Sequence, residues 1–180
     1  MFDPTIFDNL KVVVEGAIYD LDLCGELQVL DRKDRVELST MSRYYALKFS
    51  LPNCTDCCAE LRLWANTEDL AGEILELDNT QGKSYGCYLK PVFHKYVHKE
   101  NAEFECEASL KLAHKIWGNA TIVQKISYTY GEYDSSALQE MLISFGRKFG
   151  EEVIEDIPTM IEHMVMMLER LSNSSNNSHH

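Results

Sequence analysis

One stretch near the C-terminus constrains the fold most, because residues 136–171 carry the only long helical periodicity in the chain. Ser136 and Gln139 form a capping box, which predicts a helix start. Apolar residues then recur at helical spacing and form one stripe: Leu138, Met141, Leu142, Phe145, Phe149 and Val153. Gly146 and Gly150, four residues apart, either admit a close helical neighbour or end this helix near Gly150.

A second helix is predicted directly afterwards, with Asp156 as its N-cap and Pro158 in its first turn. Its apolar residues are Ile157, Met160, Ile161, Met164, Val165, Met167, Leu168 and Leu171. At about 100° per residue they cover roughly 160° of the helix circumference, which is wider than the buried face of a simple surface helix. Such an arc needs cover from two directions. The sheet would supply one, and the preceding helix or a second subunit the other.

Antiparallel strands are predicted over most of the remaining chain. The expected strands are 9–23, 26–30, 44–51, 59–64, 85–98, 104–116 and 122–130. The alternation from Phe104 to Ile116 is the most regular of these, while Pro91 indicates that its strand has an exposed edge. A solvated charged loop is expected at 31–35, a short helix capped by Asn66 at 67–76, and a loop with Asp78, Asn79 and Gly82 after it.

These patterns predict an α+β fold, because no strand–helix–strand repeat is present. We expect a curved antiparallel sheet of about six to seven strands, packed on one face by the C-terminal helices. Residues 1–171 would form a single domain, and the polar segment 172–180 a disordered tail. The last two residues, His179 and His180, resemble the start of an expression tag.

Charge and composition narrow the functional classes. The net charge is −12 and the pI is about 4.9, with no basic run in the sequence, which argues against binding to nucleic acid or to an anionic membrane. No signal peptide and no membrane-length apolar run are recognised. Six cysteines in such a chain predict reduced thiols and a cytoplasmic protein.

The most distinctive motif is Cys54-x-x-Cys57-Cys58, which could bind zinc through thiolates. A structural zinc site needs two further ligands, and His94 and His98, on one strand, would lie about 13 Å apart. A redox role usually requires the motif at a helix N-terminus. We therefore interpret the cysteines as reduced thiols and expect no metal and no cofactor.

No catalytic constellation or phosphate-binding loop is recognisable, although an enzyme assembled from scattered residues remains an alternative. His114 is expected to be buried on the dry face of its strand, and His163 to be solvated on the last helix.

The functional hypothesis is a non-enzymatic, cytosolic interaction protein, an adaptor or regulator that forms a homodimer. The alternative is a carrier of a small apolar ligand, with its pocket between the sheet and the C-terminal helices. That pocket would be lined by Tyr128, Tyr130, Phe145 and Met164.

Overall fold

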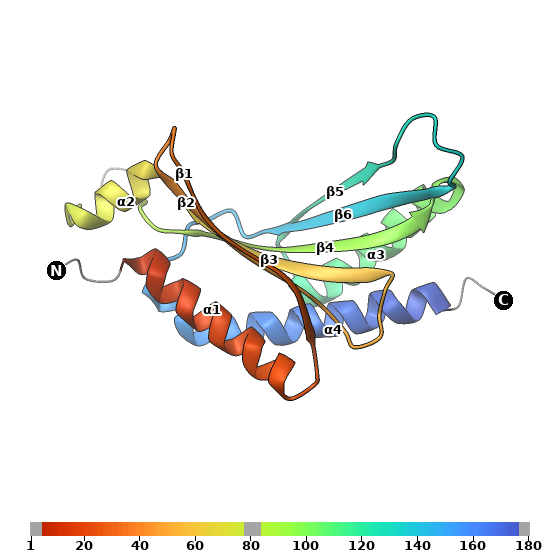
Figure 1. Cartoon of the computed structure of the whole chain (residues 1–180), viewed down its shortest axis with the longest axis horizontal. Coiled ribbons are helices and arrows are strands. Elements are labelled where there is room, and N and C mark those ends of the chain that lie inside the picture. Colours follow the sequence, from red (N-terminus) through yellow and green to blue (C-terminus); the bar gives the residue numbers. More distant parts are fainter. Residues whose placement is uncertain (1–4, 78–83, 177–180) are drawn as a thin grey trace.

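The computed structural model describes residues 5–77 and 84–176, so the predicted loop with Asp78, Asn79 and Gly82 lies outside the described residues. Six antiparallel strands form one open sheet in the order β1-β2-β3-β4-β6-β5 (Figure 1). The strands are β1 (Gln28–Glu37), β2 (Ser42–Ser50), β3 (Cys57–Ala65), β4 (Tyr88–His98), β5 (Thr121–Ser127) and β6 (Ser136–Ser144). The helices are α1 (Ile6–Leu23), α2 (Thr67–Ile74), α3 (Ala102–Trp117) and α4 (Ile157–Asn176), with short 3-10 turns η1 (Lys99–Asn101) and η2 (Glu151–Asp156). The predicted α+β class is confirmed.

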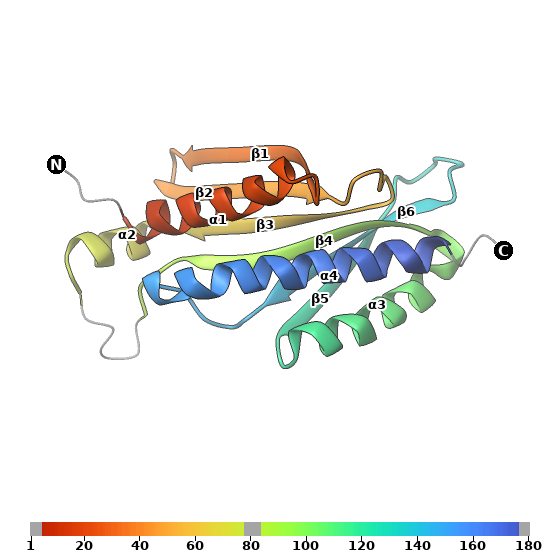
Figure 2. The ribbon, with the colours of Figure 1, turned by 90° about the horizontal axis from the view of Figure 1, so that it is seen from below.

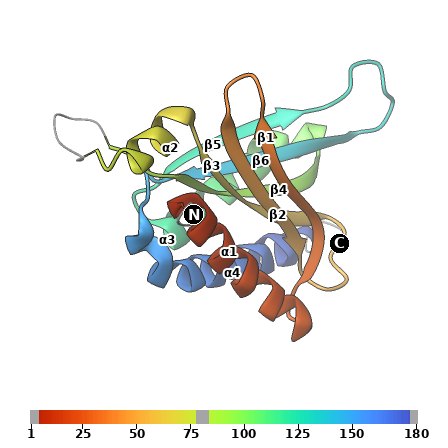
Figure 3. The same cartoon turned by 60° about the vertical axis from the view of Figure 1, so that its left-hand side comes forward.

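Helices α1, α3 and α4 cover one face of the sheet (Figures 1 and 3). None of the described helices covers the other face, which we call the bare face. Seen from the helical side, α4 runs between α1 and α3 and contacts both (Figure 2). The wide apolar arc predicted for α4 is confirmed, since Ile157, Met164 and Leu168 are fully buried. Its cover comes from the sheet, α1 and α3. The helix continues to Asn176, past the domain boundary predicted at residue 171.

Strands β2 and β3 form as their alternation predicts. Tyr45, Leu47 and Phe49 of β2 face the helices, and so do Leu61 and Leu63 of β3. These side chains are fully buried in the core between the sheet and the helices. The short helix after Asn66 is also confirmed, with a capping box formed by Asn66 and Asp69.

The N-terminal segment predicted as a strand is helix α1. Its buried residues are Phe7, Leu10, Val14 and Ile18, which recur every three or four positions and form one helical stripe. Val12 lies two residues from both Leu10 and Val14 and is 66% exposed, whereas on a strand these three side chains would share one face. Thr5 accepts a hydrogen bond from the backbone N–H of Asp8 and caps the helix.

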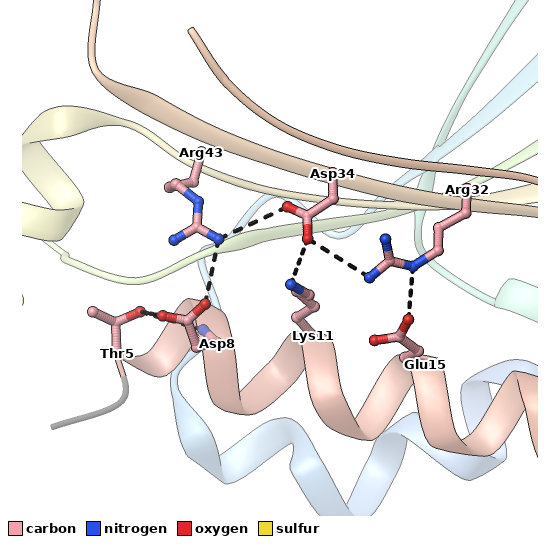
Figure 4. Close-up of polar contacts among 7 residues, drawn as sticks. All are labelled: Thr5, Asp8, Lys11, Glu15, Arg32, Asp34 and Arg43. Carbon is pink, nitrogen blue, oxygen red and sulfur yellow. Dashed lines mark hydrogen bonds and ion pairs between the residues drawn. The ribbon is translucent and has the colours of Figure 1, made fainter. Parts of the chain in front are cut away.

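The charged segment at 31–35, predicted as a loop, belongs to strand β1. Its alternate side chains point toward α1, and Figure 4 shows the resulting ion pairs. Arg32 Nε lies 2.7 Å from Glu15 Oε1, and Lys11 Nζ lies 2.5 Å from Asp34 Oδ2. The polar residues therefore form a seam between α1 and the edge strand.

The segment with the most regular alternation is helix α3, not a strand. Only Ser109 and Ala113 are buried, with Leu112, Ile116 and Trp117 packed partly against the core. Phe104 is 73% exposed, and His114, expected to be buried, is exposed. Small buried residues allow α3 to lie close to the sheet and α4, and they carry little hydrophobic signal in the sequence.

The helix predicted from Ser136 is strand β6, which lies between β4 and β5. Ala137, Gln139, Met141 and Ile143 face the helices, while Leu138 and Leu142 face the bare side. Apolar residues on both faces imitated helical stripes. The segment with Gly146 and Gly150 is a loop after β6.

Pro91 does not lie on an edge strand, because β4 is flanked by β3 and β6. Pairing with β6 begins only at Val92, however, so at Pro91 the β6 side of the strand is unpaired. The chain after β6 diverges from β4 and rejoins it at the bridge between Cys87 and Phe149. Gly86 permits this contact: its φ is +149°, and a Cβ there would lie 2.6 Å from the carbonyl oxygen of Phe149.

Candidate functional site

The bare face of the sheet carries an ordered array of polar and aromatic side chains. Strand register places them in transverse rows on the side away from the helices. We call the first the aromatic row: Tyr44, Trp64 and Tyr88, with Arg35 at its β1 end. We call the second the cationic row: Lys33, Arg62 and Lys90.

The aromatic row is stacked and flanked by positive charge. The rings of Trp64 and Tyr88 are parallel within 12°, with centroids 4.9 Å apart. Lys90 Nζ lies 5.3 Å from the centroid of Trp64, and the Arg35 guanidinium lies 4.4 Å from that of Tyr44. These distances suit cation–π attraction, so the amphipathic rings and the cations form one continuous surface.

A cleft of about 600 Å³ opens beside this surface. It lies where β4 and the chain after β6 diverge, and its lining includes Trp64, Tyr88, Lys90, Arg147 and Lys148. Arg147 is exposed at the rim. The cleft therefore joins stacked aromatic rings to several cations.

Lys148 anchors the cleft wall to α2. Its Nζ lies 2.6 Å from Oδ1 of Asp69, a carboxylate that is 2% exposed. Burial lowers the pKa of Lys148, but the hydrogen bond to Asp69 outweighs burial, so this pKa lies above its ordinary value. The Lys148 charge is therefore satisfied internally.

Glu60 of β3 forms the buried centre of the bare face. The side chain is 3% exposed, and its Oε1 lies 2.6 Å from Arg62 Nε. Lys33 Nζ lies 3.7 Å from Oε2. Burial raises the pKa of Glu60, but the Arg62 hydrogen bond and the charges of Arg62 and Lys33 outweigh it, so this pKa is lowered. The carboxylate stays charged and holds two members of the cationic row in place.

His94 faces the same side from β4, directly opposite Cys58 of β3. Its Nε2 is buried with no hydrogen-bond partner within the described part of the chain. Burial and the charge of Lys48 lower the pKa of His94 more than Glu60 and Glu140 raise it. The imidazole is therefore held neutral near pH 7.

Charge is distributed unevenly between the strands and the helices of the fold. The six strands contain nine Lys and Arg against five Asp and Glu, a net charge of +4. The α-helices and 3-10 turns contain five Lys and Arg against 17 Asp and Glu, a net charge of −12. The acidic composition thus conceals a sheet of the opposite sign.

Several cations of the sheet and of the cleft form no ion pair within the described part of the chain. Among residues 5–77 and 84–176, no ion pair involves Arg35, Lys48, Lys90, Lys125 or Arg147. The chain contains 29 Asp and Glu, so carboxylates are plentiful. The bare face can therefore accept carboxylates from another molecule.

The four ligand-binding residues predicted from the sequence lie in different environments. Tyr130 is 96% exposed and Tyr128 is 63% exposed, both after the end of β5. Phe145 lines the cleft, whereas Met164 has no exposed surface and belongs to the core. His163, expected to be solvated, is half-buried against the ring of Trp117 at 5.7 Å.

The cysteine motif lies at the beginning of β3. Cys57 points toward α4 and Cys58 toward the bare face, so the three sulfurs do not converge. In the part of the chain that the structure describes, no group of three His, Cys, Asp or Glu residues could hold a metal ion. None of the described helices is long and apolar enough to span a membrane.

Comparisons of the chain with family models, with curated proteins and with solved structures find no match.

Of the bare-face residues, the outward positions of Arg62 and Trp64 follow from the alternation in β3. Arg147 and Lys148 were missed because their segment was assigned to a helix. A functional assignment must therefore come from the arrangement of these side chains.

Proposed function

We propose that the protein is a non-enzymatic interaction protein that binds an acidic segment of a partner protein on the bare face of its sheet. The observation that carries the proposal is a set of cations around the stacked Trp64 and Tyr88 rings that form no ion pair among the described residues. They lie on a face that none of the described helices covers. Aromatic and Arg side chains are enriched at protein interfaces, where desolvated rings contribute most of the affinity.

The adjacent rows also indicate the chemistry of the partner. A segment that crosses the strands would meet aromatic rings on one side and cations on the other. Acidic residues interspersed with apolar or aromatic ones would satisfy both rows. The helices and 3-10 turns carry a net charge of −12, and the field of this acidic charge opposes long polyanions, which disfavours nucleic acid as the occupant.

Trp64 offers a direct optical test. The only other tryptophan, Trp117, lies on the helical side, and its buried Nε1 has no hydrogen-bond partner within the described residues. The change Trp117→Phe therefore removes the second fluorophore without breaking a hydrogen bond. In this background, we expect a synthetic peptide that alternates Glu with Leu and Phe to shift the Trp64 emission, and the same peptide with Gln for Glu to bind weakly.

A charge reversal locates the binding surface. We expect Lys90→Glu combined with Arg147→Glu to weaken peptide affinity roughly thirtyfold, because two attractions and two repulsions of about 0.5 kcal/mol each amount to about 2 kcal/mol. The matched control is Lys111→Glu with Lys115→Glu, which makes the same charge change at exposed positions of α3. Equal losses in both double variants would refute the assignment, and so would tighter binding of a single-stranded oligonucleotide than of the peptide.

Self-association is a separate part of the proposal. The broad arc of α4 that motivated it is covered by α1 and α3 within one chain, so the structure supplies no independent reason for a dimer. Native mass spectrometry at micromolar concentration decides the question. A mass of two chains supports the homodimer, and a mass of one chain ends that part of the proposal.

The alternative, a carrier of a small apolar ligand, has less support. Met164 is fully buried and Tyr130 is almost fully exposed, so one ligand could contact both only after a large rearrangement. Phe145 alone of the four predicted residues lines the cleft described above.

A further inference from the structure

The motif Cys54-x-x-Cys57 places two thiols almost within bonding distance. The Sγ atoms of Cys54 and Cys57 lie 3.3 Å apart, and a disulfide bond is about 2.05 Å long. Cys54 lies in the loop before β3, and Cys57 is the first residue of that strand. A displacement of little more than 1 Å by a loop residue would therefore bring the sulfurs together.

The surroundings of the two thiols differ. Cys57 is 3% exposed and faces the backbone carbonyl of Leu168 in α4, at 4.0 Å from Sγ. Cys54 is half-buried, and its Sγ lies 3.7 Å from the hydroxyl oxygen of Ser172. Cys54 is thus the thiol that a reagent from solvent meets first, with Cys57 behind it.

The two thiols also differ in acidity, and the more exposed Cys54 is the more acidic. Burial raises the pKa of Cys54, but the hydrogen bonds available from Cys57, Ser172 and the backbone outweigh burial, so this pKa is lowered. Burial raises the pKa of Cys57 far above its ordinary value. Because the thiolate is the reactive form, Cys54 is suited to attack and Cys57 to complete the reaction.

We propose that Cys54 and Cys57 form a redox-active pair, which a low-molecular-weight disulfide oxidises to an intramolecular disulfide. The Cys54 thiolate attacks one sulfur of the reagent, whose S–S bond breaks and releases one thiolate. The released thiolate takes the proton of the Cys57 thiol, and the Cys57 thiolate attacks Cys54 Sγ. The bond between Cys54 and the small thiol breaks, and the second thiolate leaves and takes a proton from solvent. Two protein thiols are oxidised, and the reagent is reduced to two small thiols. A thioredoxin-like strand–helix context is not required, since the loop before β3 already brings the sulfurs together.

Glutathione disulfide serves as the probe. The full chain is equilibrated in glutathione buffers of increasing disulfide content, quenched with acid, and blocked with a maleimide. We expect intact mass to fall by two hydrogen atoms before blocking, with two fewer maleimide adducts, and peptide mapping to find both missing sites at Cys54 and Cys57. A disulfide that includes Cys58, or a chain that carries only a glutathione adduct on Cys54, would overturn the proposal.

Variants distinguish the roles of the sulfurs. With Cys57→Ala the reaction should stop at a stable glutathione adduct on Cys54, and with Cys54→Ser Cys57 should stay reduced. Cys58→Ser is the matched control, because that side chain points to the opposite face of β3 and its loss should leave disulfide formation unchanged. Loss of the disulfide in Cys58→Ser, with the fold intact by circular dichroism, would contradict the assignment. The wild-type measurement tests the proposal even if a variant fails to fold.

Discussion

Replacement of Met164 by Ala tests whether α4 is closed against the sheet or open to a ligand. Met164 is fully buried, and the change removes Cγ, Sδ and Cε. At about 0.8 kcal/mol for each buried methylene-sized group, these atoms contribute about 2.4 kcal/mol. A residual void of about 40 Å³ adds about 1 kcal/mol, at about 24 cal/mol per Å³. The expected loss in the free energy of unfolding is therefore about 3.4 kcal/mol.

Met166 provides the control in the same helix. It is 42% exposed, so Met166→Ala should change stability by less than about 0.5 kcal/mol, while the change in helix propensity is the same for both variants. Urea unfolding followed by circular dichroism measures both values, with the slope of each transition as a check of two-state behaviour. A loss below about 1 kcal/mol for Met164→Ala would refute the packing argument and would return Met164 to the ligand-binding role predicted from the sequence.

Two further predictions use matched pairs. Gly72→Ala should destabilise the protein by about 1–3 kcal/mol, because its Cβ would lie 2.2 Å from the Tyr85 ring. Gly16→Ala, with no atom within 4 Å of its Cβ, should stabilise α1 by about 0.5–1 kcal/mol. If urea unfolding shows that Gly72→Ala and Gly16→Ala change the free energy of unfolding in the same direction, this pair of predictions is wrong. Burial chiefly lowers the pKa of His94 in the folded chain. Just below the ordinary pKa of His, the unfolded chain therefore binds more protons than the folded chain. The free energy of unfolding consequently decreases as the pH falls through this range. His94→Gln should remove this decrease in the free energy of unfolding between about pH 7.5 and 5.5, whereas His114→Gln, at an exposed position, should leave it in place. If the pH dependence of the free energy of unfolding is unchanged in His94→Gln, the prediction is wrong.

The elements that sequence analysis placed correctly are those with one clear apolar face. Helix α4 has a long stripe at helical spacing, and β2 and β3 alternate strictly between core and bare side. In these segments local periodicity and tertiary burial agree, so the pattern alone identifies the element.

The errors have a shared physical cause. In β6, Met141 and Ile143 face the helices while Leu138 and Leu142 face the other side, and the two apolar sets together have spacings that resemble a helical stripe. In α3 the buried residues are Ser109 and Ala113. The larger apolar side chains that alternate along this segment therefore do not mark its buried face. The β1 edge was mistaken for a loop because its charged residues have their partners on α1, which is distant in sequence from the strand.

Sequence by itself determined the α+β class, the burial of α4 and the acidic character of the chain. Only the tertiary structure decided that strand register sorts the charges into a basic sheet and acidic helices, and that Trp64 stacks on Tyr88. It also decided that the chain after β6 separates from β4 at Pro91 and leaves a cleft there. These features arise from pairing between residues far apart in the chain, and a periodicity that extends over a few neighbouring residues carries no information about such partners.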